Sequence, residues 1–253
     1  METLKLAQRK PFFSIFRLNS GLNSGLNAGL FVLLLATLGH GMAHAAALDE
    51  LTPADQDRVK RGEKVTLTEP VTGSVWPRTK VYQRLPGKPE GYAAQFNDYR
   101  EHVRIFDDLR KSEISQQVDR TTVEVSYLMT FPKIEGLPVA IPDENYVTRN
   151  TLSTPDQGVS YRIDWTFVRA DTMKDCNGSL RVEPLQGDTL LVYTNFINPP
   201  KPSLAKLITR LAISRVEKAV DQIGAYTQKE YREHPSVVED RIRALRRAVG
   251  LDR

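Results

Sequence analysis

The sequence has few of the residues on which metal sites and nucleophilic enzymes depend. One cysteine, Cys176, and four histidines occur among 253 residues. The chain therefore cannot form an internal disulfide and offers few soft metal ligands. It contains no Cys-x-x-Cys or His-Glu-x-x-His spacing, no Gly-x-Ser-x-Gly elbow and no glycine-rich phosphate loop. The sequence predicts no catalytic residue, no metal and no cofactor.

Charge is missing from one long stretch near the N-terminus. No charged residue lies between Arg17 and Asp49, and this stretch contains the apolar run "AGLFVLLLATLG". Basic residues precede the run, and "AHAAA" follows it with small residues suited to cleavage after Ala45 or Ala47. This layout predicts that residues 1–47 form a signal peptide and that the mature protein is periplasmic or secreted. An uncleaved anchor is the alternative, because the uncharged stretch is long enough to span a bilayer.

Without that segment the chain has little net charge. Residues 48–253 contain 31 basic and 30 acidic residues, a net charge of +1. The pI of about 9.1 therefore does not indicate a nucleic-acid partner. Residues 232–253 include the arginine-rich "RIRALRRAVGLDR" and are expected to form a basic helical tail. Such a tail either packs loosely on its own domain or contacts anionic lipid headgroups. We expect a monomer.

Helical patterns precede the β-rich part of the chain. Residues 48–62 predict a short helical lead, in which Thr52 is placed to cap a helix and Pro53 suits its first turn. After a proline-punctuated β segment, residues 89–109 predict two short helices that carry Tyr99 and Phe106. His102 in these helices is expected to be solvent-exposed, with an acid–base role as the alternative.

From residue 110 onward, strands with one apolar face are predicted. "TTVEVSYLMTF" and "YRIDWTF" alternate strictly, while "GDTLLVYTNFI" is apolar on both faces. The aromatic and large apolar residues of these strands include Tyr127, Met129, Tyr161, Ile163, Trp165 and Tyr193. Asn177-Gly178 predicts a hairpin turn, which would leave Cys176 as an exposed thiol at the hairpin tip.

The period changes again after residue 200. Apolar residues such as Leu207 and Leu211 recur at helical spacing from Ser203, which is placed to cap a helix. At 1.5 Å per residue this helix would extend for about 40 Å. A long amphipathic helix that follows a curved antiparallel sheet can lie in the concave face of that sheet. The two short helices at 89–109 would then close one end of a cavity.

This order of elements resembles the START-like, or SRPBCC, helix-grip superfamily, including its coenzyme-Q-binding and polyketide-cyclase-like branches. The resemblance covers roughly residues 60–231, and the domain itself is expected at 63–231. It rests on "GEKVTLTEPVTGSVWPRTKVYQRL", "FNDYREHVRIFDDLRKSEI", the strands from "YRIDWTF" to "YTNFINPP" and the helix from Ser203. It implies an α+β fold in which a curved antiparallel sheet wraps around a long C-terminal helix, with two short lid helices.

The resemblance further implies a hydrophobic small molecule, such as a lipid or isoprenoid-like compound, held between sheet and helix. The residues expected to line its cavity are Tyr99, Phe106, Tyr127, Met129, Tyr161, Ile163, Trp165, Tyr193, Leu207 and Leu211. Core packing is the alternative for each of them. Two other functions stay open: an enzyme of the cyclase or aromatase kind that uses tyrosine as acid or base, and an envelope interaction module without a ligand.

Overall fold

The computed structural model describes residues 46–130, 142–199, 205–206 and 208–252. The predicted signal peptide, most of the 132–143 connection and Leu207 lie outside these residues. Within the described part of the chain, no helix is both long and apolar enough to cross a membrane.

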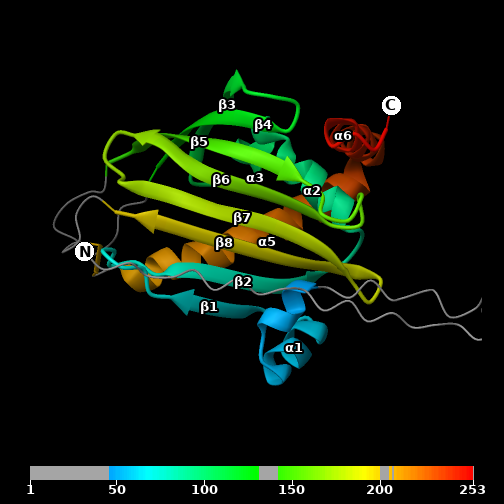
Figure 1. The fold of residues 1–253 in the computed structure, drawn as a ribbon, viewed down its shortest axis with the longest axis horizontal. Helices are drawn as coiled ribbons and strands as arrows, with labels where there is room; N and C mark the ends of the chain where they lie inside the picture. The colour runs from blue at the N-terminus through cyan, green and yellow to red at the C-terminus, as the bar shows by residue number, and fades with distance from the viewer. Residues whose placement is uncertain (1–45, 131–141, 200–204, 207, 253) are drawn as a thin grey trace, which may run out of the picture. The chain divides into compact units, whose positions relative to one another are not determined.

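Figure 1 shows a single antiparallel sheet with helices on both of its faces. Its eight strands follow the order β1-β2-β8-β7-β6-β5-β4-β3. The strands are β1 (Val65–Glu69), β2 (Arg78–Leu85), β3 (Leu109–Gln117), β4 (Thr122–Met129), β5 (Glu144–Ser153), β6 (Tyr161–Ala170), β7 (Asp175–Leu185) and β8 (Asp188–Asn198). Six consecutive strands, β3 to β8, follow the short helices, as the sequence predicted, and β1 and β2 form a hairpin before them.

The long helix α5 (Thr209–Glu233) covers one face of the sheet, which we call the inner face. Its apolar residues Val216, Val220 and Ile223 are buried in the same core cluster as the inward residues of the strands. The helix-grip prediction is confirmed. Ser203, the predicted start, lies outside the described residues, and α5 begins at Thr209.

The short helices close one end of the inner face. They are α2 (Pro89–Asn97), the 3-10 turn η2 (Tyr99–Glu101) and α3 (His102–Ile105). A further helix, α6 (Pro235–Ala248), follows α5 and packs against α2, with Val238 and Leu245 buried. The described part of the predicted tail, residues 232–252, is thus held to the domain by apolar burial, with Arg241 bonded to Asp98 and Glu230.

The opposite, outer face is covered only in part. The 3-10 helix η1 (Ala46–Glu50) and α1 (Pro53–Lys60) pack over it near β1, β2, β7 and β8. Ala47, Leu48 and Val59 meet Tyr82, Leu190 and Val192 there. This cover explains why β8 is apolar on both faces, whereas β6 exposes Arg162 and Asp164 as an ion pair. Thr52 caps α1 as predicted, because its hydroxyl accepts from the Asp55 amide.

The hairpin predicted at Asn177-Gly178 is wrong. Both residues lie inside β7, where Asn177 pairs with Phe196 and Gly178 pairs with Asn195. The chain instead turns between Ala170 and Asp175. Glycine is needed at 178 for a different reason: a Cβ atom there would overlap the Trp165 indole and the Thr194 carbonyl oxygen. Close approach of neighbouring groups accounts for this glycine within a strand.

Candidate functional site

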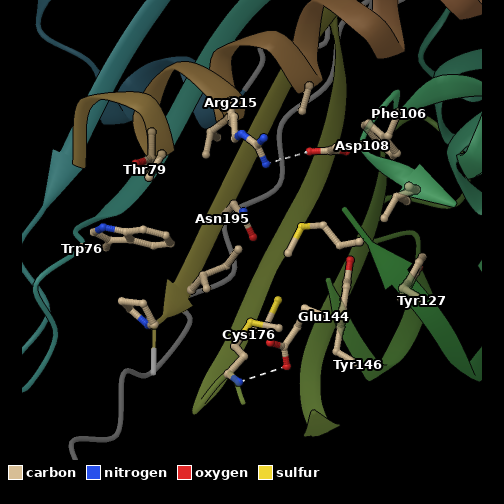
Figure 2. Close-up of a pocket in the computed structure, with 18 of the residues that line it drawn as sticks. Trp76, Thr79, Phe106, Asp108, Tyr127, Glu144, Tyr146, Cys176, Asn195 and Arg215 are labelled. Atoms are coloured by element: carbon tan, nitrogen blue, oxygen red, sulfur yellow. Dashed lines mark hydrogen bonds and ion pairs between the residues drawn. The ribbon is translucent and has the colours of Figure 1, made fainter. Parts of the chain in front are cut away.

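A cavity of about 630 Å³ lies between the inner face of the sheet and α5. Its walls are the strands β2 and β4 to β8, the α2–α3 segment and the first turns of α5. Figure 2 shows labelled side chains at the cavity from β2, β4, β5, β7, β8 and α5. The volume falls in the range of small-molecule sites, which are about 300–1,000 Å³.

One end of the cavity is aromatic. Phe96 of α2 lies with its ring centroid 6.0 Å from that of Trp165 and 6.3 Å from that of Phe106. Trp165 in turn lies 5.3 Å from Tyr193. The indole of Trp165 occupies the space above Gly178 that any other residue would fill. Such rings offer rigid apolar surface to a ligand.

His102 belongs to this aromatic end and is buried, so the expectation that it is solvent-exposed is wrong. Its Nε2 lies 2.7 Å from the carbonyl oxygen of Phe96, and its Nδ1 lies 3.4 Å from the hydroxyl of Tyr127. A carbonyl can only accept, so Nε2 carries the proton and Nδ1 accepts from Tyr127. Burial lowers the pKa of His102 to about 4. The imidazole is therefore neutral at pH 7. The sequence could not predict this, because the burial of His102 depends on how α3 packs in the fold.

Three tyrosines line the middle of the cavity. Tyr127 stacks on Tyr146 with centroids 4.9 Å apart, and Tyr193 lies across from them on β8. Burial raises the pKa of Tyr127 and Tyr146 well above the ordinary value, and it raises the pKa of Tyr193 as well. All three stay protonated near neutral pH, so they act as hydrogen-bonding groups rather than as phenolate bases.

The charged side chains described at the cavity have ion-pair or hydrogen-bond partners. Arg215 of α5 reaches Asp108 with its Nη1 3.4 Å from Oδ2 (Figure 2). Burial raises the pKa of Asp108, and Arg215 opposes that shift. Glu144 accepts from the amides of Thr172 and Met173 at 2.7 and 3.1 Å and from the Thr172 hydroxyl. Among the described residues no cluster of three metal-ligating side chains occurs.

The structure brings half of the predicted site residues together. Those that line the cavity are Phe106, Tyr127, Met129, Trp165 and Tyr193. Tyr99 is buried beside His102 with ring centroids 5.3 Å apart, outside the cavity. Tyr161 and Ile163 lie in the packed core farther along β6, and Leu211 is half-buried on α5 away from the lining. Leu207 lies outside the described residues.

Several lining residues were missed by sequence reasoning. Cys176 is buried and lines the cavity, so the expectation of an exposed thiol is wrong. The error follows from the hairpin misplaced at Asn177-Gly178; reading "DCNGSLRVEP" as one strand would have turned Cys176 inward. Trp76, Asn195 and Glu144 carry no motif, and only strand pairing and loop closure bring them to the cavity.

Solved structures resemble this fold although sequences do not. No protein-family model and no curated protein matches the chain. A STAR-related lipid transfer protein from Xanthomonas axonopodis is similar with a TM-score of 0.55 at 12% identity, over 65% of this chain and 93% of that one. Human STARD10 is similar with a TM-score of 0.52 at 13% identity, over 68% and 74%. The Zhui aromatase/cyclase from Streptomyces is similar with a TM-score of 0.50 at 13% identity, over 68% and 98%.

These likenesses agree with the strand order and the gripped helix. The chain has the START-like helix-grip fold, with its cavity between the sheet and α5.

Proposed function

We propose that the protein binds a hydrophobic small molecule, a lipid or an isoprenoid-like compound, in the cavity between the sheet and α5. The observation that carries this proposal is a cavity of about 630 Å³ walled mainly by aromatic and aliphatic side chains. Removing apolar surface from water drives such binding at about 25 cal/mol per Å². The lipid-transfer proteins of the same fold support it.

The chain contains its own reporters of cavity occupancy. Its one cysteine and both of its tryptophans, Trp76 and Trp165, line the cavity. The pKa of the Cys176 thiol is raised to about 12 by burial, so its alkylation is best followed at pH 9. We use farnesol, a neutral isoprenoid alcohol, as the first probe.

Farnesol should slow iodoacetamide modification of Cys176, measured on the Cys176 peptide by mass spectrometry, and should change tryptophan emission over the same concentration range. Protein alkylated in denaturant serves as the control for complete reaction. Native mass spectrometry after gentle purification should show a bound lipid. Equal modification rates with and without farnesol, together with protein that is always recovered empty, would refute binding.

A cyclase- or aromatase-like enzyme is the second candidate. The contact between the Tyr127 hydroxyl and His102 Nδ1 supports it, because it places a hydrogen-bonded phenol inside the cavity, and an aromatase/cyclase shares the fold. This activity requires chemical change of the bound molecule. Recovery of every ligand with unchanged mass after long incubation would count against it. A ligand-free interaction module is the least supported candidate. Such a module needs no internal cavity, whereas this domain contains one.

We further propose that the protein is exported, after removal of the leader, to the periplasm or the exterior, and that it is a monomer. A peripheral membrane contact through residues 232–253 would use the exposed Arg232 and Arg247. Arg241, Arg243 and Arg246 are engaged by acidic residues. Binding of the protein to vesicles containing anionic phosphatidylglycerol, and its loss in R232Q/R247Q, would test this contact.

A further inference from the structure

Two polar side chains stand side by side on the apolar floor of the cavity. Thr79 of β2 and Asn195 of β8 are register partners, and both line the cavity (Figure 2). The neighbour of Asn195 on the next strand is Gly178, which has no side chain. Space beside the Asn195 amide is therefore bounded by the edge of the Trp165 indole rather than by a third strand residue.

Neither side chain is satisfied by the protein. Thr79 is 3% exposed and Asn195 is half-buried. Within the described residues no hydrogen bond joins the Thr79 hydroxyl or the Asn195 amide to another group, and neither is a fully enclosed polar atom, so both are accessible from the cavity. By contrast, Asn150 on the same face donates to Thr148. A ligand that displaces water from these groups must replace its hydrogen bonds, since leaving a polar group unpaired costs about 1–3 kcal/mol. A ligand that fills the cavity therefore needs a polar group opposite the pair at 79 and 195.

The electrostatics of the cavity restrict that partner to a neutral group. Among the described residues that line the cavity, Arg215 is the cationic one, and it forms an ion pair with Asp108. Asp108 and Glu144 are carboxylates at the same cavity, so a ligand carboxylate or phosphate would meet repulsion and a desolvation cost. A carbonyl or hydroxyl oxygen has neither problem. It can accept from both the Asn195 amide and the Thr79 hydroxyl.

We propose that Thr79 and Asn195 form a polar subsite that selects ligands bearing a neutral carbonyl or hydroxyl oxygen on an apolar framework, against hydrocarbons and against anions. The inference rests on the proposed function, because it assumes that the cavity is occupied. The subsite predicts the orientation of the bound ligand. Its oxygen lies at Thr79 and Asn195, and its apolar part extends toward Trp165 and Phe96.

Three naphthalenes of one size test this subsite: 2-acetylnaphthalene, 2-ethylnaphthalene and 2-naphthoate, with Kd measured by equilibrium dialysis at pH 7. The ethyl compound is more hydrophobic than the ketone and can bind more tightly for that reason alone. The preference is therefore measured as Kd(ethyl)/Kd(acetyl) in wild type divided by the same ratio in each variant. The ratio Kd(ethyl)/Kd(acetyl) should fall about fivefold in N195L and by a similar factor in T79V, as expected for one lost hydrogen bond of about 1 kcal/mol. The naphthoate should bind wild type at least about tenfold more weakly than the ketone.

T194V is the matched control, because Thr194 is the next residue of β8 and faces the outer side. It should leave the ratio unchanged. T79V is nearly isosteric and is expected to fold even if N195L does not. A ratio unchanged in T79V and in folded N195L would overturn the subsite. If none of the naphthalenes binds wild type although farnesol protects Cys176, the subsite fails and the proposed function stands. If farnesol does not protect Cys176 either and the protein is always recovered empty, the proposed function itself fails.

Discussion

Arg241 of α6 lies 3.0 Å from Glu230 of α5, and the same guanidinium reaches Asp98 at 2.8 Å and Glu101 at 3.3 Å. It also donates to the side-chain oxygen of Gln95 at 2.7 Å. One side chain thus joins α2, η2, α5 and α6. We call this group of residues the α2–α6 clasp.

Removing the guanidinium should destabilise the protein strongly. The side chains of Arg241 and Glu230 are 14% and 11% exposed, so R241M would leave the buried Glu230 carboxylate without its cationic partner, whereas Glu101 would keep Arg104 and Tyr226. Breaking a buried ion pair costs about 3 kcal/mol or more. Urea denaturation should show this loss. R243M, which removes an exposed pair with Asp240, should change stability by less than about 1 kcal/mol. Equal effects of the two substitutions would contradict the clasp.

The buried imidazole of His102 should make stability pH-dependent. Its folded-state pKa of about 4 lies below the ordinary value of 6.5, so protonation favours the unfolded state. Stability should be complete above about pH 6.5 and fall by up to about 3 kcal/mol as the pH drops toward 4. H102Q can still donate to the Phe96 carbonyl and should lose this part of the slope. H234Q at an exposed site should keep it. A slope that persists in H102Q would assign the effect to other groups.

With the proposed export, the N-terminal boundary of the folded domain predicts the position of the cleavage site. The amide of Ala47 donates to Glu183 Oε2 at 2.9 Å, and Ala47 is completely buried against the outer face. Cleavage after Ala45 keeps this contact, whereas cleavage after Ala47 removes it. N-terminal sequencing of exported protein should therefore begin at Ala46. A chain that starts at Leu48 should be less stable by about 1 kcal/mol in thermal unfolding. Protein that retains residues 1–45 would contradict cleavage altogether.

Adding one methyl group at Gly178 should damage the cavity floor. In G178A the new Cβ atom would overlap both the Trp165 ring and the Thr194 carbonyl oxygen, which are held by the sheet. Overpacking of this kind costs about 1–3 kcal/mol. We expect a lower melting temperature and an altered near-ultraviolet circular dichroism signal from Trp165. S179A, at the next position of β7, should change neither measurement appreciably. A fully stable G178A with a native spectrum would contradict this prediction, because it would show that Trp165 and β8 can move to accommodate the methyl group.

Residues whose pattern is set locally were predictable. The alternation through Val123, Val125 and Tyr127 fixed the buried face of β4, and the helical spacing of Val216, Val220 and Ile223 fixed that of α5. The order of elements followed from these periods. Half of the residues predicted to line a cavity do lie at this one, because inward residues of neighbouring strands must share a face.

What failed depended on distant partners. Asn-Gly has a strong turn preference, yet at 177–178 pairing with β8 overrides it. The sequence around His102 is typical of a surface segment. Its burial depends on distant residues such as Tyr127, which is 25 positions later in the chain. Nothing local indicates that Thr79 and Asn195 are neighbours, since only the closure of β2 onto β8 pairs them. Contacts between distant segments could not be predicted from the sequence alone.

The α2–α6 clasp has a consequence for how this molecule is made. Arg241 and Asp98 are 143 positions apart, so every strand from β3 to β8 is synthesised between them. A ribosome-bound chain that extends only through β8 has neither the buried arginine nor the apolar residues that cover α2. Contacts of such high order form late and slowly. Nascent chains of this protein should therefore remain open to proteases and chaperones until α6 emerges.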